Sequence, residues 1–141
     1  MTQKSKLYFG HPINVYGTEL EKELIETIAR SFPGWQIENP NQKHHEESYQ
    51  RYADSGGRGM DYYFREVLPK CHGGIFLPFR DGKYGAGVFG EAEFLQKQGC
   101  RIWQITDTGY ISRLELSASL ALSVYETRSR IRTPSRELKP Y

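Results

Sequence analysis

The sequence predicts an α/β fold: a single doubly wound, mainly parallel sheet of about five strands with helices on both faces, arranged as in flavodoxin-like or Rossmann-like proteins. Two observations predict it. Short apolar segments alternate along the chain with longer segments whose apolar residues recur at helical spacing, a pattern typical of parallel sheets with right-handed crossovers. The chain of 141 residues also suits one domain, which buries roughly two-thirds of its unfolded surface without disulfides or a structural metal.

The first part of the chain supplies two strands and one helix. Lys6–Gly10 is a short apolar strand that ends in a turn-rich stretch, after which Thr18 can cap a helix over Glu19–Ser31. A proline–glycine pair follows, and Trp35–Glu38 is expected to form the second strand. The apolar positions of the helix share one face: Leu20, Leu24, Ile25 and Ile28.

A polar insert is expected at residues 39–57. It contains the cluster His44-His45-Glu46-Glu47, whose residue types can bind metals but which lacks the H-E-x-x-H spacing of a zinc site. We therefore interpret the cluster as solvated sequence and predict no bound metal.

The rest of the chain continues the alternation. The expected elements are, in order, a helix at Asp61–Lys70, a buried strand at Gly73–Phe79, a loop at Arg80–Gly87, a helix at Val88–Gln98 and a strand at Arg101–Thr106. Ser123 and Glu126 have the spacing of a capping box, which predicts a last helix that ends near Arg132. The predicted domain therefore spans residues 1–132, and residues 133–141 are expected to be a disordered tail.

Composition and charge argue against several classes of function. The 19 basic and 17 acidic residues are well mixed, unlike a nucleic-acid-binding stripe or a membrane-binding face, and the basic run Arg128–Lys139 is interpreted as a solvated helix end and tail rather than a phosphate site. No apolar run approaches the roughly 20 residues that span a bilayer, and Met1–Lys6 lacks the features of a signal peptide. Cys71 and Cys100 have no metal-like spacing, so we expect a reduced, cytoplasmic protein. From the mixed charges and the lack of a long apolar run, we expect neither nucleic acid nor a membrane as a partner.

Two loops follow the strands at the sheet edge where parallel sheets bind ligands. They are Gly10–Asn14 and Arg80–Gly87, and they meet if the first and third strands are neighbours. The second loop leads into Gly85-Ala86-Gly87-Val88-Phe89-Gly90, a G-x-G-x-x-G run whose backbone N–H groups either bind an anion such as phosphate or serve only the turn. A dinucleotide site with Asp107 at the ribose is the less favoured interpretation, because five residues separate the strand from the first glycine. We predict no cofactor.

Three segments carry a family resemblance: Leu7-Tyr8-Phe9-Gly10, the strand Gly73–Phe79, and Gly87-Val88-Phe89-Gly90-Glu91 followed by Gly99. Together they resemble the nucleoside 2-deoxyribosyltransferase superfamily, which also contains the deoxynucleoside 5′-monophosphate N-glycosidases. In that superfamily the first strand carries an aromatic-glycine pattern, and a glycine-bearing loop leads into a helix whose first turn holds the nucleophilic glutamate. That helix ends at a glycine eight residues further on, as Glu91 and Gly99 do here.

The resemblance implies cleavage or transfer of the N-glycosidic bond of a small-molecule nucleoside or nucleotide, through a covalent glycosyl-glutamate intermediate. Glu91 is then the nucleophile, and His11, Asp81 or Asp61 protonates the departing base. The other implied substrate contacts are Tyr8 and Gly10 in the pocket wall, Asp61, the amides of Gly85 and Gly87, and Arg80 and Lys83 if a phosphate is present. The family also implies a homo-oligomer, a dimer or larger.

Two positions depart from the family pattern. This chain has Cys71-His72 where family members often carry an aspartate before the third strand, and Gly85 where they carry an aspartate or a serine. In the family these residues help to hold or protonate the base. The alternative prediction is therefore a nucleotide-binding module of the same fold that does not catalyse a reaction.

Overall fold

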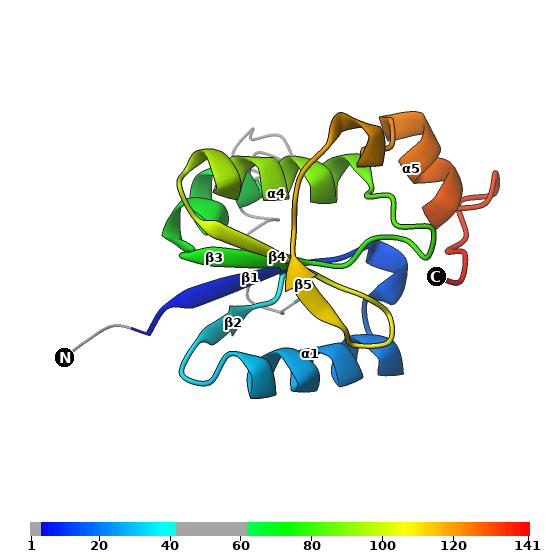
Figure 1. The fold of residues 1–141 in the computed structure, drawn as a ribbon. Coiled ribbons are helices and arrows are strands. Elements are labelled where there is room, and N and C mark those ends of the chain that lie inside the picture. The colour runs from blue at the N-terminus through cyan, green and yellow to red at the C-terminus, as the bar shows by residue number, and fades with distance from the viewer. Residues whose placement is uncertain (1–3, 42–61) are drawn as a thin grey trace.

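The computed structural model describes residues 4–41 and 62–141, and these residues form one five-stranded sheet in the order β2-β1-β3-β4-β5 (Figure 1). The strands are β1 (Lys6–Gly10), β2 (Gln36–Glu38), β3 (Gly73–Phe76), β4 (Arg101–Ile105) and β5 (Ile111–Arg113). β1 pairs in parallel with β2 and β3, β3 pairs in parallel with β4, and β5 runs antiparallel to β4. The prediction of a mainly parallel α/β sheet is confirmed, with an antiparallel strand at one edge.

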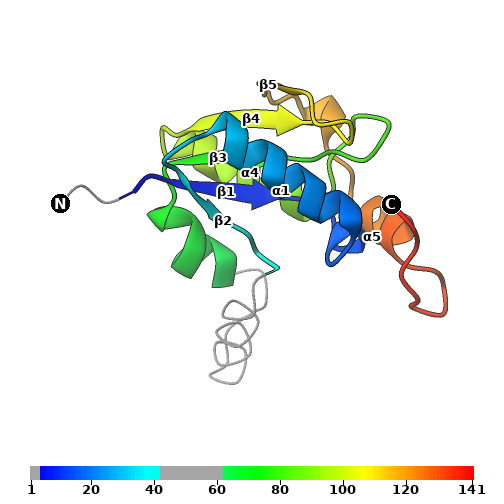
Figure 2. The ribbon, with the colours of Figure 1, turned by 90° about the horizontal axis from the view of Figure 1, so that it is seen from below.

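Helices α1 (Glu19–Ser31) and α4 (Ala86–Lys97) lie on opposite sides of the sheet in Figures 1 and 2. β1 is buried between them, and its side chains alternate between two apolar clusters. Leu7 and Phe9 belong to the cluster on the α1 side, and Tyr8 belongs to the cluster on the α4 side. Because β1 is covered on both faces, its buried residues Leu7, Tyr8 and Phe9 are all apolar and do not alternate with polar residues.

Two helix starts follow directly from side-chain caps. The Thr18 hydroxyl accepts a hydrogen bond from the Glu21 N–H (3.3 Å), and α1 has the bounds that the sequence predicted. Helix α5 (Val124–Ile131) begins with the predicted capping box, in which the Ser123 and Glu126 side chains each accept from the other residue's backbone N–H. Each cap involves residues only three positions apart, so both helix starts could be predicted from the sequence without knowledge of the fold.

The segment before β3 differs from its prediction. Instead of one α-helix over Asp61–Lys70, the structure has a π-helical turn (Tyr63–Val67) followed by a 3-10 turn (Leu68–Lys70). Pro69 has no backbone N–H with which to continue an α-helical hydrogen-bond pattern, and this explains the change of helix type. The predicted site residue Asp61 and residues 42–57 of the predicted insert, which include the cluster at His44, lie outside the described residues.

Three other elements differ from their predictions. β3 ends at Phe76 rather than Phe79, because Pro78 cannot donate a hydrogen bond to a neighbouring strand. α4 begins at Ala86, two residues before the predicted start, with Gly85 as its N-cap. β5 was not predicted, since three residues of mixed polarity give no clear period, and the chain reaches this strand through a turn in which Gly109 has a φ of 89°.

The segment 133–141, expected to be a disordered tail, is packed against the domain. The Tyr141 ring stacks on Phe79 with ring centroids 6.3 Å apart, and its hydroxyl donates to the Pro78 carbonyl oxygen. Within the segment, the Thr133 N–H donates to the Glu137 carbonyl oxygen (2.8 Å). The packing of this segment could not be predicted from its polar composition, because it depends on one aromatic residue, Tyr141, whose partner Phe79 lies far away in the sequence.

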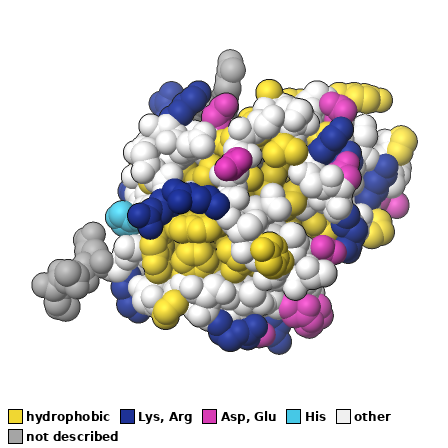
Figure 3. Space-filling model, viewed as in Figure 1, with side chains coloured by type: hydrophobic (Ala, Val, Ile, Leu, Met, Phe, Trp, Pro, Cys, Tyr) yellow, Lys and Arg dark blue, Asp and Glu magenta, His cyan; other side chains and the backbone are white. Residues whose placement is uncertain are grey.

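Charged side chains of both signs are mixed over the face shown in Figure 3, as the composition indicated. Such a surface has no extended field of one sign. Among the helices of the described residues, none is both long and apolar enough to cross a membrane.

Candidate functional site

A cavity of about 1420 Å³ lies at the carboxyl end of the sheet, between the end of β1, the start of α4 and helix α5. In Figure 2 the arrows of β1 and β4 point toward the end of the molecule where α5 lies. β1 and β3 are neighbours, so the two loops that were expected to meet are both at this edge. Of the predicted site residues, the cavity wall contains Tyr8, His11, Gly85, Gly87 and Glu91.

Glu91 is a buried carboxylate in the wall of this cavity, with only 6% of its surface exposed. The Tyr8 hydroxyl, from the adjacent strand β1, donates a hydrogen bond to Glu91 Oε2. Since α4 begins at Ala86, Glu91 lies in the second turn of the helix and not in the first, where it was expected. Glu91 is therefore not explained as a helix-start residue that favours the helix dipole.

Burial changes the ionisation of both partners. Burial raises the pKa of Glu91 to about 7, and the hydrogen bond from Tyr8 acts in the opposite direction without cancelling it. Burial and the nearby Glu91 charge raise the pKa of Tyr8 well above its usual value, so Tyr8 remains a hydroxyl that can donate. At neutral pH Glu91 is thus divided between carboxylate and carboxylic acid, a state suited to proton transfer or nucleophilic attack.

Gly10 lies beneath this pair rather than in the cavity wall. A Cβ atom added at Gly10 would be 2.5 Å from Cδ1 of Phe76 and 3.4 Å from Oε1 of Glu91. Gly10 was expected in the pocket wall, and it is not among the described residues that line the cavity. The glycine allows the end of β1 to approach the Phe76 ring closely.

His11 lies in the cavity wall, but both of its ring nitrogens have partners. Nδ1 is 2.9 Å from the Phe9 carbonyl oxygen and Nε2 is 2.8 Å from Glu21 Oε2. Because a carbonyl oxygen can only accept, Nδ1 carries a hydrogen. Burial acts to raise the pKa of Glu21, but the hydrogen bonds from His11, Asn41 and the Gly17 N–H outweigh it and lower that pKa. His11 must release Glu21 before it can act on a ligand through Nε2.

The three charged residues of the loop before α4 do not line the cavity. Asp81 accepts two hydrogen bonds from the Arg130 guanidinium (2.8 and 2.7 Å), and this contact is the main reason that the pKa of Asp81 is lowered to about 2. Arg80 pairs with Asp107 and lies over the Tyr141 ring, 4.6 Å from its centroid. Asp81, Arg80 and Lys83 thus lie outside the wall of the Glu91 cavity, and Asp81 is held in its ionised form.

The glycine-rich start of α4 does contribute to the cavity. Gly85 has no side chain to cap the helix, and the Ala86 N–H instead donates to the Thr127 hydroxyl of α5 (2.8 Å). A Cβ atom at Gly85 would come within 2.9 Å of the Thr127 methyl carbon, so the glycine permits α5 to approach. This contact joins the two helices at the mouth of the cavity.

The cavity also contains residues that the sequence did not mark as functional. Tyr16 is in the wall, and its ring centroid is 4.8 Å from that of His11. Four basic residues of α5 and the segment after it are in the wall as well: Arg128, Arg132, Arg136 and Lys139. Their spacing in the sequence was visible, but the fold is needed to see that α5 packs at this end of the sheet.

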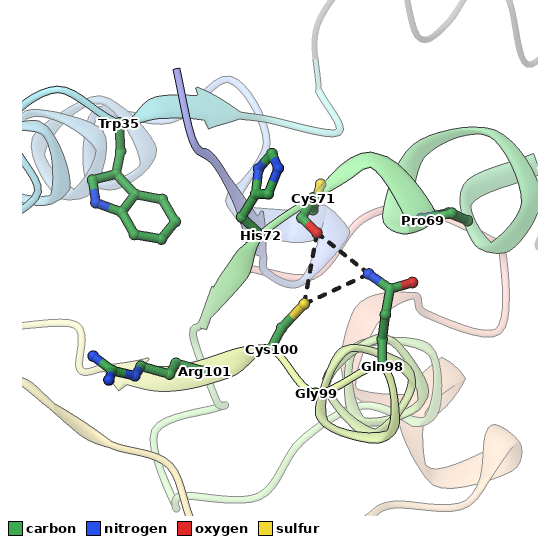
Figure 4. A pocket seen from close by; sticks show the side chains of 8 residues that line it. All are labelled: Trp35, Pro69, Cys71, His72, Gln98, Gly99, Cys100 and Arg101. Carbon is green, nitrogen blue, oxygen red and sulfur yellow. Dashed lines mark hydrogen bonds between the residues drawn. The ribbon is translucent and has the colours of Figure 1, made fainter. Parts of the chain in front are cut away.

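A second cavity, of about 620 Å³, lies near the amino ends of β3 and β4 (Figure 4). There the Gln98 amide and the Cys100 thiol both donate to the Cys71 carbonyl oxygen, at 3.3 and 3.6 Å. Burial raises the pKa of the Cys71 thiol to about 12, so it is not a ready thiolate nucleophile. His72 Nδ1 accepts a hydrogen bond from the Lys6 N–H (2.9 Å). These groups satisfy one another, and the cavity at Glu91 is the stronger candidate.

Within the described part of the chain, no group of three or more His, Cys, Asp or Glu residues is placed to hold a metal ion. Comparisons of the chain with protein-family models, with curated proteins and with solved structures found no match. The fold and the cavity define the protein as an α/β protein with a mixed sheet and a buried carboxylate at the carboxyl end of its strands.

Proposed function

We propose that the protein cleaves or transfers the N-glycosidic bond of a nucleoside or nucleotide, with Glu91 as the nucleophile. The observation that carries the proposal is the buried Glu91 carboxylate, which lies in a cavity wall and is held by Tyr8. The strand order β2-β1-β3-β4-β5 is that of flavodoxin-like sheets, which bind ligands at the switch point between β1 and β3. The resemblance to the nucleoside 2-deoxyribosyltransferase superfamily supports the same site.

The reaction needs Glu91 as a carboxylate. Its oxygen attacks the anomeric carbon of the sugar, the bond from that carbon to the base nitrogen breaks, and the base nitrogen gains a proton. Water or a second base then attacks the glycosyl ester and regenerates the carboxylate. The Tyr8 hydrogen bond orients the carboxylate. Of the proposed acids, Asp81 is the least suited because Arg130 keeps it ionised.

A second candidate is a nucleotide-binding module of this fold without catalysis. It is favoured by the occupied nitrogens of His11 and by Cys71-His72 and Gly85 at positions that are often acidic or polar in the family. Such a module would be stabilised by its ligand and would release no product. In either case we propose a homo-oligomer, which light scattering coupled to size exclusion would reveal.

The test is chromatographic detection of free base after incubation with nucleosides, deoxynucleosides and their 5′-monophosphates. We expect release by the natural chain and none by Glu91→Gln. Glu93→Gln is the matched control, because Glu93 lies on the same helix and its side chain is 48% exposed. Equal release by the natural chain and Glu91→Gln would exclude Glu91 as the nucleophile. No release, combined with a thermal shift by a nucleotide, would favour the binding module.

A further inference from the structure

We propose that α5 and the segment after it form a basic wall that binds the phosphate group of a ligand in the Glu91 cavity. The basic wall consists of Arg128, Arg132, Arg136 and Lys139, all of which line the cavity. This inference adds a phosphate-binding site to the proposed function. It rests on that function only for the nucleoside part of the ligand. It assigns the phosphate contact to residues other than Arg80 and Lys83, which lie outside the cavity wall.

The charges that line the cavity are unbalanced. Among the described residues that line it, four side chains are basic and one is acidic, that of Glu91, which is itself buried and divided between its charged and neutral forms near neutral pH. Within the described residues, none of the four basic side chains forms an ion pair with a carboxylate. A cavity with excess positive charge attracts an anion, and guanidinium groups match the geometry of phosphate oxygens.

The orientation of α5 explains which arginines belong to the wall. Arg128 lies in α5, and Arg132 is the extended C-cap residue that follows it; both line the cavity, whereas Arg130, two residues from Arg128 on the helix, does not. Arg130 binds Asp81 through two hydrogen bonds, which fixes its guanidinium outside the cavity wall. The Asp81 carboxylate thus has a positioning role for α5.

The wall is held in place before any ligand binds. Thr127 accepts the Ala86 N–H, and the Asn14 side chain donates to the Arg130 carbonyl oxygen (3.5 Å). In the following segment, Arg132 donates to the Arg136 carbonyl oxygen (2.9 Å) and Lys139 donates to the Ser129 carbonyl oxygen (2.6 Å). These carbonyl partners orient two of the four cations, Arg132 and Lys139, without neutralising them. A wall that is already ordered loses less entropy when it binds an anion.

The experiment measures binding by calorimetry, with Glu91→Gln as the background so that no ligand is consumed. The probes are a deoxynucleoside, its 5′-monophosphate and inorganic pyrophosphate. Arg128→Gln with Arg132→Gln removes two cations from the wall. Arg101→Gln with Arg113→Gln removes the same charge from β4 and β5, where both residues are exposed and neither lines the Glu91 cavity.

We expect the 5′-monophosphate and pyrophosphate to bind at least tenfold more weakly to the Arg128→Gln, Arg132→Gln protein, with the deoxynucleoside unchanged and the control protein unaffected. Equal loss in the control protein would overturn the wall, since it would show a general charge effect. Absence of pyrophosphate binding to the background protein would overturn it as well. Wall-dependent binding of pyrophosphate without any binding of the deoxynucleoside would support the wall and contradict the proposed nucleoside chemistry.

Discussion

Replacing Glu91 by glutamine tests whether burial of this carboxylate destabilises the folded protein. Burial raises the pKa of Glu91 from its ordinary value of 4.5 to about 7. This difference corresponds to about 3 kcal/mol, at about 1.4 kcal/mol per pKa unit. Between these two pH values the unfolded carboxyl has lost its proton while the folded one retains it. The favourable contribution of the neutral form is therefore complete below pH 4.5 and is lost as the pH rises through 7.

Glutamine has nearly the shape of the protonated glutamate and can still accept the Tyr8 hydrogen bond. We therefore expect Glu91→Gln to be about 3 kcal/mol more stable than the natural chain at pH 8.5, or on the order of 10 °C in Tm. At pH 4.5 the two proteins should differ little. Urea unfolding followed by tryptophan fluorescence measures both values, and Glu93→Gln serves as the exposed control. Equal stability of Glu91→Gln and the natural chain at pH 8.5 would refute the burial argument.

Four further predictions test the candidate site. For the proposed reaction, kcat/KM should rise with pH through about 7, because Glu91 must lose its proton to attack; a rate independent of pH from 5 to 8 contradicts this. Tyr8→Phe removes a hydrogen bond that lowers the Glu91 pKa, so the rise should move to higher pH, with about 1 kcal/mol less stability by urea unfolding. Gly10→Ala places a Cβ 2.5 Å from the Phe76 ring and should cost about 1–3 kcal/mol in the same assay; an unchanged midpoint would show that the ring yields freely. Asp81→Asn should retain turnover of a deoxynucleoside, which has no phosphate for the basic wall to bind, since Asp81 lies outside the cavity wall; loss of that turnover in a folded protein would restore Asp81 as the acid.

What could be predicted from the sequence was the part encoded by neighbouring residues. The Thr18 cap gave the start of α1, and the Ser123 capping box gave the start of α5. The glycine at position 99, with a φ of 89°, marks the end of α4, where a side chain would be strained. Each of these signals lies within a few residues of the feature that it determines, and each was confirmed.

The contacts that define the candidate site join residues far apart in the sequence. Tyr8 and Glu91 are 83 residues apart, and Asp81 and Arg130 are 49 residues apart. The sequence suggested Asp81 as an acid because it is an aspartate in the right loop, but nothing in the loop shows that Arg130 will bind it. The basic residues of α5 were interpreted as solvated for the same reason, since their role depends on where α5 packs.

The stability and turnover of Glu91→Gln together decide whether this carboxylate is functional. A buried ionisable group that lowers stability near neutral pH is expected to persist where its charge is needed for activity. A variant that is more stable and inactive would show that Glu91 lowers the stability of the folded protein and is required for turnover. A variant that is more stable and fully active would leave Glu91 without that explanation. If instead neither the variant nor the natural chain released base, the binding module would be the better account of the cavity, because recognition of a phosphate by Arg128 and Arg132 does not require the Glu91 charge.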